Sequence, residues 1–135
     1  MDLTLRAVGV VRSTLTDKAT APKFETENAP SATVILDPAY AAAAKDLAPG
    51  QEILLFTWFH QADRACQAVH PRRDLSRPLT GVFSTRSPDR PNPIGLHRVR
   101  LTAVEGNVLT IDALEALDGT PVVDIKPLAD RGKGA

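Results

Sequence analysis

The chain has 135 residues, of which 43% are hydrophobic and 24% charged, and its formal net charge at pH 7 is zero. This size and composition are typical of one globular domain and exclude a chain that is disordered throughout. We find no apolar run long enough to span a membrane and no signal peptide, and the single cysteine, Cys66, excludes a disulfide framework, so we expect a cytoplasmic protein.

Short apolar and β-branched runs, separated by turn residues, predict a chain made mostly of strands. In chain order the predicted strands cover residues 5–12, 33–36, 51–59, 80–84, 94–104, 108–114 and 121–125. Within 94–104, Val99 and Leu101 alternate with Arg98 and Arg100, which predicts one buried and one exposed face. Residues 105–107 (Glu-Gly-Asn) predict the turn of a hairpin.

One main helix is predicted over residues 38–47. Asp37 is a typical N-cap, Pro38 suits the first helical position, and Pro49-Gly50 ends the pattern. Strands do not alternate with helices, and no glycine-rich nucleotide motif is present. We therefore expect a mainly β fold, a small β-barrel of short strands with one main helix, and no Rossmann domain.

Positive charge is concentrated in the middle of the chain. Residues 64–100 contain eight arginines, two aspartates and no lysine, a net charge of +6, and the remainder carries −6. Arginine presents a planar set of donors that suits phosphates and carboxylates, so its exclusive use favours bound anions. Solvated loop charges and internal ion pairs remain the alternative for any single arginine.

The most unusual stretch is the proline-rich segment 81–96. Arg86 and Arg90 lie four residues apart, Asn92 stands between two prolines, and Gly95 allows close approach of a ligand or a neighbouring strand. A rigid loop of this kind holds functional side chains at low entropic cost, although an ornate structural turn would look the same.

The sequence does not favour a metal site. The available side chains lack a recognised ligand spacing. They are His60, Asp63, Cys66, His70 and His97.

Segment 81–96 resembles the signature of the TsaA-like family of TrmO-type tRNA methyltransferases, whose pattern is close to G-V-F-[AS]-T-R-[SA]-x-x-R-P-N-P-I-G-L. Residues 9–13, 58–64 and 117–127 resemble three further family motifs in the same order. The resemblance runs from about residue 8 to residue 127. Family members often carry a second, C-terminal domain, whereas this chain ends soon after Lys126-Pro127, so we expect a single domain over residues 1–135.

The resemblance implies a non-Rossmann β-barrel that forms homodimers and binds S-adenosylmethionine near the subunit interface. It also implies methylation of N6 of threonylcarbamoyladenosine beside the tRNA anticodon. Carried onto this chain, the cofactor-binding candidates are Pro22, Lys23, Phe24, His60, Gln61, Arg86, Leu96, Leu117, Asp118, Gly119 and Thr120. The first three depart from the family's usual Pro-Arg-Gln.

Each candidate can be read against the cofactor's chemistry. Arg86 suits the carboxylate as a bidentate donor, and Asp118 suits the ammonium or the ribose, or is simply a turn residue. Leu96 and Leu117 would flank the adenine or pack in the core. His60, Asp118 or a backbone carbonyl would accept the proton from the substrate amine. The sequence does not separate these acceptors.

The RNA-binding candidates come from the basic central segment, where arginine suits phosphate. They are Arg72, Arg73, Arg77, Arg90, Asn92, Arg98 and Arg100. Two alternatives stay open: a methyltransferase of the same fold acting on a small molecule or another RNA, and a module that binds S-adenosylmethionine without turnover.

Overall fold

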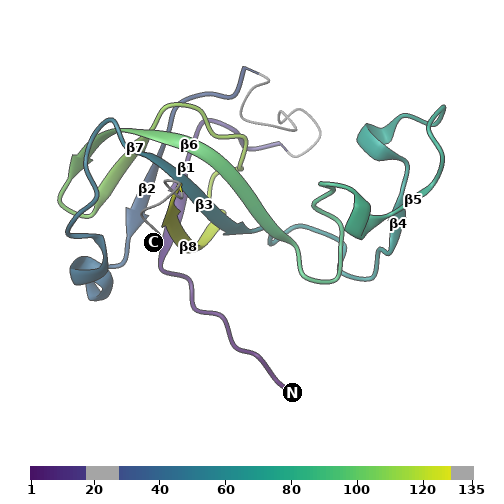
Figure 1. Ribbon diagram of the computed structural model, residues 1–135, viewed down its shortest axis with the longest axis horizontal. Helices are drawn as coiled ribbons and strands as arrows, with labels where there is room; N and C mark the ends of the chain where they lie inside the picture. The colour runs from purple at the N-terminus through teal and green to yellow at the C-terminus, as the bar shows by residue number, and fades with distance from the viewer. Residues whose placement is uncertain (18–27, 129–135) are drawn as a thin grey trace.

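The computed structural model describes residues 1–17 and 28–128, and its central feature is a closed barrel of six strands (Figure 1). The strands are β1 (Gly9–Arg12), β2 (Ala32–Leu36), β3 (Glu52–Trp58), β6 (Ile94–Glu105), β7 (Val108–Ile111) and β8 (Pro121–Pro127). Their order around the barrel is β1-β2-β7-β6-β3-β8, and every neighbouring pair is antiparallel. The predicted mainly β barrel is confirmed.

Alternation of side chains builds the barrel core. On β6, Val99 and Leu101 point inward and are buried, whereas Arg98 and Arg100 are exposed, as the sequence predicts, and His97 is buried on the inward face as well. The fully buried apolar side chains from the barrel strands include Val11, Val34, Ile53, Leu55, Leu101, Leu109, Ile111 and Val122. The predicted hairpin between β6 and β7 is also present, with Gly106 at a positive φ of 61°.

Four predicted strands are shorter in the structure, including 51–59, which is β3 (Glu52–Trp58), and 108–114, which is β7 (Val108–Ile111). The first begins at Gly9 rather than at Leu5, because the residues before it lie outside the barrel and Leu5 is exposed. The predicted strand 80–84 is only the two-residue β5 (Thr80–Gly81), which pairs with β4 (Ala68–Val69). The chain then turns into a short 3₁₀ helix, η3 (Val82–Ser84), so the strand cannot continue.

The predicted helix is a 3₁₀ helix, η1 (Pro38–Ala44), and not an element that reaches residue 47. Its predicted N-cap is confirmed, since the Asp37 carboxylate accepts from the Ala39 amide at 2.9 Å. Tyr40 interrupts the helical backbone, and no residue of η1 is buried. A segment this short gains little from helix formation alone, and its contribution is to pack Ala44 and Leu47 against the barrel core.

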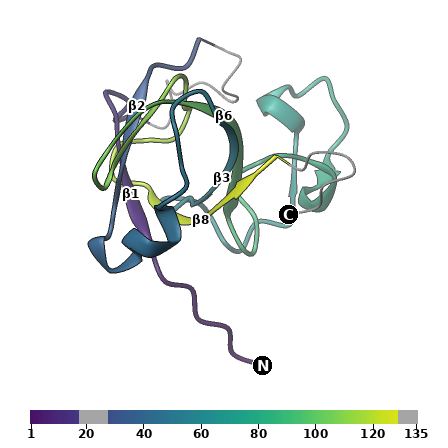
Figure 2. The same cartoon turned by 60° about the vertical axis from the view of Figure 1, so that its left-hand side comes forward.

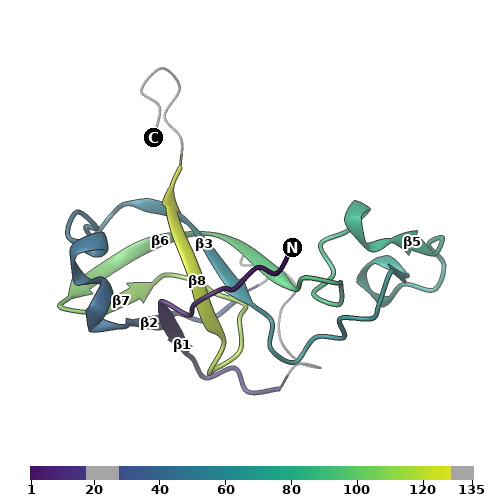
Figure 3. The ribbon, with the colours of Figure 1, turned by 90° about the horizontal axis from the view of Figure 1, so that it is seen from below.

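Residues 60–93 leave the barrel between β3 and β6 and form a separate projection, which we call the lobe. It contains β4, β5, η3 and a further 3₁₀ turn, η2 (Pro71–Arg73). The lobe lies at one end of the molecule and η1 at the other (Figures 1 and 3). Figure 2 looks into the barrel and shows the lobe beside it. Across the described residues, no helix is long and apolar enough to cross a membrane.

Candidate active site

A cavity of about 440 Å³ lies between one end of the barrel and the lobe. This is within the usual size range of small-molecule sites. Its walls come from the end of β3, the loop between β7 and β8, and the lobe. The lining residues are Phe59–Ala62, Val69–Arg73, Arg77, Ser84–Asp89, Glu115–Leu117 and Thr120.

The barrel side of the cavity is formed by the loop between β7 and β8, and this loop is fixed to β1. The Gly119 amide donates to the Val11 carbonyl at 2.8 Å, and Gly119 adopts a φ of 84°, a conformation that favours glycine. Thr120 closes the turn, since its hydroxyl donates to the Leu117 carbonyl at 2.7 Å. The loop therefore presents Leu117 and Thr120 to the cavity from a rigid base.

The lobe side of the cavity contains two arginines with unusual backbone geometry. Arg72 and Arg73 are consecutive and have φ values of 56° and 59°. Side chains other than glycine, asparagine and aspartate rarely enter this left-handed region, which costs about 1–2 kcal/mol per residue. The backbone is held there by bonds from the Arg73 amide to the His70 carbonyl, 3.0 Å, and from the Asp74 amide to the Pro71 carbonyl, 3.1 Å. Strain of this kind is typical of functional turns.

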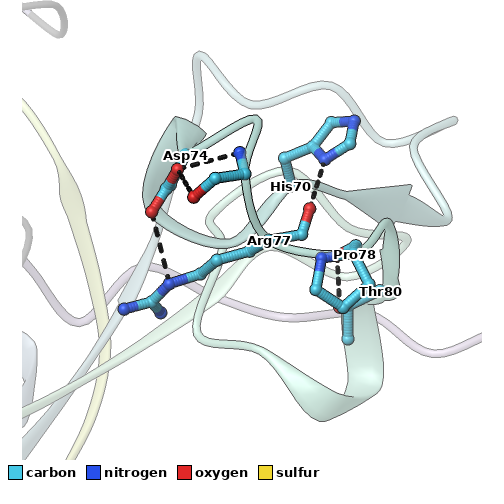
Figure 4. Close-up of polar contacts among 6 residues, drawn as sticks. His70, Asp74, Arg77, Pro78 and Thr80 are labelled. Carbon is cyan, nitrogen blue, oxygen red and sulfur yellow. Dashed lines mark hydrogen bonds and ion pairs between the residues drawn. The ribbon is translucent and has the colours of Figure 1, made fainter.

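Local hydrogen bonds hold the rest of this turn (Figure 4). The Asp74 carboxylate accepts from the amide and the hydroxyl of Ser76, at 2.9 and 2.5 Å, and pairs with Arg77 at 3.6 Å. The His70 Nδ1 lies 2.9 Å from the Arg77 carbonyl oxygen. The bonds from the hydroxyl and the amide of Ser76, with the charges of Arg77 and His70, lower the pKa of Asp74.

The signature segment 81–96 uses its two arginines differently. Arg90 is half-buried beneath η3 and donates to the carbonyl oxygens of Val82 and Thr85, the latter at 3.0 Å. Arg86 lines the cavity and donates to the Leu96 carbonyl at 2.9 Å. Arg90 therefore shapes the loop, whereas Arg86 forms part of the cavity wall.

A third arginine, Arg64, ties this segment to the end of β3. It donates to the Pro91 carbonyl at 2.8 Å and to the Asn92 side-chain oxygen at 3.2 Å, and its guanidinium lies 5.0 Å from the Trp58 ring centre. The sequence analysis gave Arg64 no role. These contacts cannot be predicted from local sequence spacing, because the two partners are 27 and 28 residues away along the chain.

The cavity gathers some of the predicted cofactor residues and leaves others outside. His60, Gln61, Arg86, Leu117 and Thr120 line it. Leu96, Asp118 and Gly119 do not belong to its lining; the Asp118 carboxylate accepts from the Ser13 amide at 3.1 Å and lies 3.8 Å from Arg12. Pro22, Lys23 and Phe24 lie outside the described residues.

The predicted RNA-binding residues fall into three groups. Arg72, Arg73 and Arg77 line the cavity. Arg90 and Asn92 hold the signature loop, as described above. Arg98 and Arg100 lie on the outer face of the barrel, where both donate to the Glu52 carboxylate, at 3.3 and 2.9 Å.

A chain of three buried polar groups, which the sequence motifs did not predict, lies at the barrel end of the cavity. The Thr57 hydroxyl lies 2.7 Å from His97 Nε2, and His97 Nδ1 bonds to Glu115 Oε1. Thr57 and His97 are fully buried and the Glu115 side chain is 8% exposed. Extending the alternation of β6 back from Val99 would have placed His97 on the buried face, where a polar group needs partners.

One oxygen of this chain has no partner. Glu115 Oε2 is buried and makes no hydrogen bond within the described part of the protein, although Glu115 lines the cavity. An unpaired buried oxygen costs about 1–3 kcal/mol, and more for a charged group. Among the described residues, no three His, Cys, Asp or Glu side chains gather around a point where a metal ion could bind.

Comparison with known proteins identifies the family. Residues 10–131 match the family model described as the tRNA-methyltransferase O N-terminal domain, which confirms the resemblance seen in the motifs. The chain is 40% identical over 127 residues to a protein of Methanothermobacter thermautotrophicus named "probable S-adenosyl-L-methionine-binding protein", with 94% of this chain and 90% of that one covered. It is 39% identical over 123 residues to an Archaeoglobus fulgidus S-adenosyl-L-methionine-binding protein, with 90% and 86% covered.

A solved structure has the same fold. The crystal structure of TrmO from Pseudomonas aeruginosa superimposes with a TM-score of 0.75 at 32% sequence identity. The match covers all of this chain but only 58% of the TrmO chain. The present chain thus spans a little over half the length of that structure.

Proposed function

Because the chain belongs to the tRNA-methyltransferase O N-terminal domain family, we propose that it is an S-adenosylmethionine-dependent methyltransferase. We propose further that it methylates N6 of threonylcarbamoyladenosine beside the tRNA anticodon. The observation that carries this proposal is the cavity, where four arginines and an unpaired carboxylate oxygen surround a partly apolar space.

The residues of the cavity fit S-adenosylmethionine, which supplies an activated methyl group when bound. The cofactor combines an apolar adenosine with charged amino-acid groups. Phe59 and Leu117 offer apolar surface, Arg86 offers a donor for the carboxylate, and Glu115 Oε2 offers an acceptor that lacks a donor. The protein's part in the reaction is to position the cofactor and its substrate and to exclude water.

An acceptor for the substrate proton is also available. Of the two side chains predicted for this role, His60 lines the cavity and Asp118 does not. An imidazole nitrogen at the cavity wall can accept a proton from an amine as it is methylated. His60 is therefore the favoured general base.

A tRNA substrate is supported by the lobe. Arg72 and Arg73 are exposed at the edge of the cavity and held by a strained turn, an arrangement suited to backbone phosphates. An anticodon loop is single-stranded, so its bases reach a protein cavity without loss of pairing energy. We place this activity in the cytoplasm, where such a substrate would be met.

We also propose that the protein acts as a homodimer, as the family resemblance implies. The lobe exposes Leu75, Leu79 and Phe83 by 80%, 64% and 86%. Apolar side chains that gather on one projection are candidates for a contact between copies. Sedimentation equilibrium of the unaltered protein and of Phe83→Ser would test this contact.

The function is tested by methyl transfer from labelled S-adenosylmethionine to two tRNA pools, one with and one without threonylcarbamoyladenosine. Digestion and mass analysis of the nucleosides would identify the product. Methylated threonylcarbamoyladenosine in the first pool alone supports the proposal. Transfer to another nucleoside, or to none, contradicts it.

A second function is binding of S-adenosylmethionine without turnover. Two relatives that match nearly their whole length are named only as S-adenosyl-L-methionine-binding proteins, and the match to TrmO covers 58% of that chain. Confirmed cofactor binding together with no methylated nucleoside from either pool would favour this second function.

A further inference from the structure

Glu115 is an acidic residue of the cavity wall whose side chain is only 8% exposed, and its carboxylate is held from one side only. His97 bonds to Oε1, while Oε2 has no partner within the described residues. A carboxylate only accepts hydrogen bonds, so His97 Nδ1 is the donor, and in the neutral imidazole Nε2 then accepts from the Thr57 hydroxyl. Thr57 and His97 therefore fix the orientation of the carboxylate, and the free oxygen remains for another molecule.

The barrel wall is built closely around this relay. A Cβ at Gly95 would come within 3.0 Å of the Thr57 hydroxyl, the Phe59 ring and the His97 imidazole. Phe59 also packs edge-on against His97, with ring centres 5.9 Å apart and an interplanar angle of 80°, and it lines the cavity. These contacts close the barrel around Thr57 and His97, and Glu115 is the member of the relay that lines the cavity, so a donor for Oε2 would come from the cavity.

The charges around the cavity indicate which donor fits. Its barrel side carries the buried Glu115 carboxylate, and its other walls carry the guanidinium groups of Arg72, Arg73, Arg77 and Arg86. A ligand with an ammonium next to a carboxylate, the pattern of a free α-amino acid, complements both. A positively charged donor compensates a desolvated carboxylate better than a neutral amine does.

We propose that Glu115 Oε2 accepts the α-ammonium of the amino-acid part of S-adenosylmethionine, while an arginine of the cavity receives the α-carboxylate. Thr57 and His97 are positioning residues for Glu115. This inference rests on the proposed function, because that function supplies the cofactor. It moves the ammonium contact from Asp118, which the sequence suggested, to a residue three positions earlier that faces the cavity.

The test is calorimetric binding of three ligands to the unaltered protein and to Glu115→Gln, which keeps the shape and removes the charge. S-adenosylmethionine and S-adenosylhomocysteine both carry the ammonium, whereas 5′-methylthioadenosine lacks the amino-acid part. We expect Glu115→Gln to weaken the binding of the first two ligands by about tenfold or more and to leave the affinity for the third unchanged. Glu105→Gln, on the exposed β6–β7 hairpin, is the matched control and should change none of them.

Thr57→Val provides a second variant, because it keeps the side-chain shape and removes the hydroxyl that holds His97. It should weaken the same two ligands by a smaller factor than Glu115→Gln, and its thermal unfolding would show that the barrel is intact. A role in structure alone would weaken all three ligands equally.

Three results for Glu115→Gln would overturn the proposal. They are an equal loss of affinity for all three ligands, no loss of affinity for any, and a loss of affinity for S-adenosylmethionine only, which would place Glu115 at the sulfonium. The failure of the proposed function looks different. If the unaltered protein binds neither S-adenosylmethionine nor 5′-methylthioadenosine, the cofactor itself is wrong and both proposals fall. If binding is normal and depends on Glu115 but tRNA is not methylated, only the substrate is wrong.

Discussion

The barrel and the lobe are stabilised in different ways. The barrel buries apolar side chains from every one of its strands, and its buried polar groups Thr57 and His97 bond to each other. The lobe, all of whose residues are described, buries only Val82 and Pro93. Its shape depends on prolines and on side chains that bond to nearby backbone, as around Asp74 (Figure 4). The cavity lies where the two regions meet, so one wall is a packed scaffold and the other a set of locally held arginines.

This difference predicts that the same substitution has a large effect on stability in the barrel and a small one in the lobe. Gly95→Ala places a Cβ against Thr57, Phe59 and His97, whereas Gly81→Ala on the lobe meets nothing within 4 Å. We expect Gly95→Ala to lower the free energy of unfolding by about 2–3 kcal/mol, as overpacking of a core does. Gly81→Ala should change it by less than about 0.5 kcal/mol. Urea denaturation of both variants measures this directly, and equal stabilities would contradict the packing described for the barrel wall.

Arg86 tests the lobe's contribution to cofactor binding. Arg86→Ala should weaken S-adenosylmethionine binding by more than about tenfold, because a charge-assisted contact with the carboxylate is lost. Calorimetry measures the affinity, and thermal unfolding shows whether loss of the bond to the Leu96 carbonyl disturbs the loop. An unchanged affinity in a folded variant would remove Arg86 from the site.

Replacing two pairs of arginines, one pair on the lobe and one on the barrel, compares how much each region contributes to RNA binding. Replacing Arg72 and Arg73 together by alanine should weaken tRNA binding by about tenfold and reduce the slope of log K against log salt by about 1.8, the value for two phosphate contacts on a duplex, or somewhat less on a single strand. The matched pair, Arg98 and Arg100, is engaged by Glu52 on the barrel. Its replacement should have the smaller effect. Filter binding at several salt concentrations measures the tRNA affinity of both double variants. A larger loss of affinity for the Arg98 and Arg100 variant would place the RNA-binding surface on the barrel.

The smallest expected effect is a loosening of the lobe in acid. The pKa of Asp74 is lower in the folded protein than its usual value of 3.8, because of the hydrogen bonds from Ser76 and the charges of Arg77 and His70. The stabilisation is therefore complete above pH 3.8 and is lost as the pH falls through the lowered value. In an NMR titration, the chemical shift of the Ser76 amide should change in that pH range, while the chemical shifts of amides in the barrel strands should stay constant. Asp74→Asn should abolish the transition, and its persistence would assign it to another group.

The sequence predicts the barrel better than the lobe for a physical reason. Strands such as β6 alternate because one face is buried, so their pattern records the fold. The lobe has little to bury, and its backbone follows local bonds that composition does not reveal. The left-handed conformations of Arg72 and Arg73 are an example, since neither position carries the glycine or asparagine that signals them.

The candidate site shows the same limit. Family motifs suggested Arg86 and Leu117, which line the cavity, and Asp118, which does not. Glu115 was missed because its role in the site depends on a contact with His97, which lies 18 residues earlier on a different segment. Only the barrel brings the two side chains together and leaves one buried carboxylate oxygen without a hydrogen bond among the described residues.

The central claim is that S-adenosylmethionine binds between the barrel end and the lobe. The most direct test is an NMR titration of the labelled protein with S-adenosylmethionine. The account predicts that the amide signals of both walls shift together, Leu117 and Thr120 on the barrel side and Arg72 and Arg86 on the lobe, while the signal of Gly106 in the distant β6–β7 hairpin does not. Shifts confined to one wall, or centred on the hairpin, would contradict it.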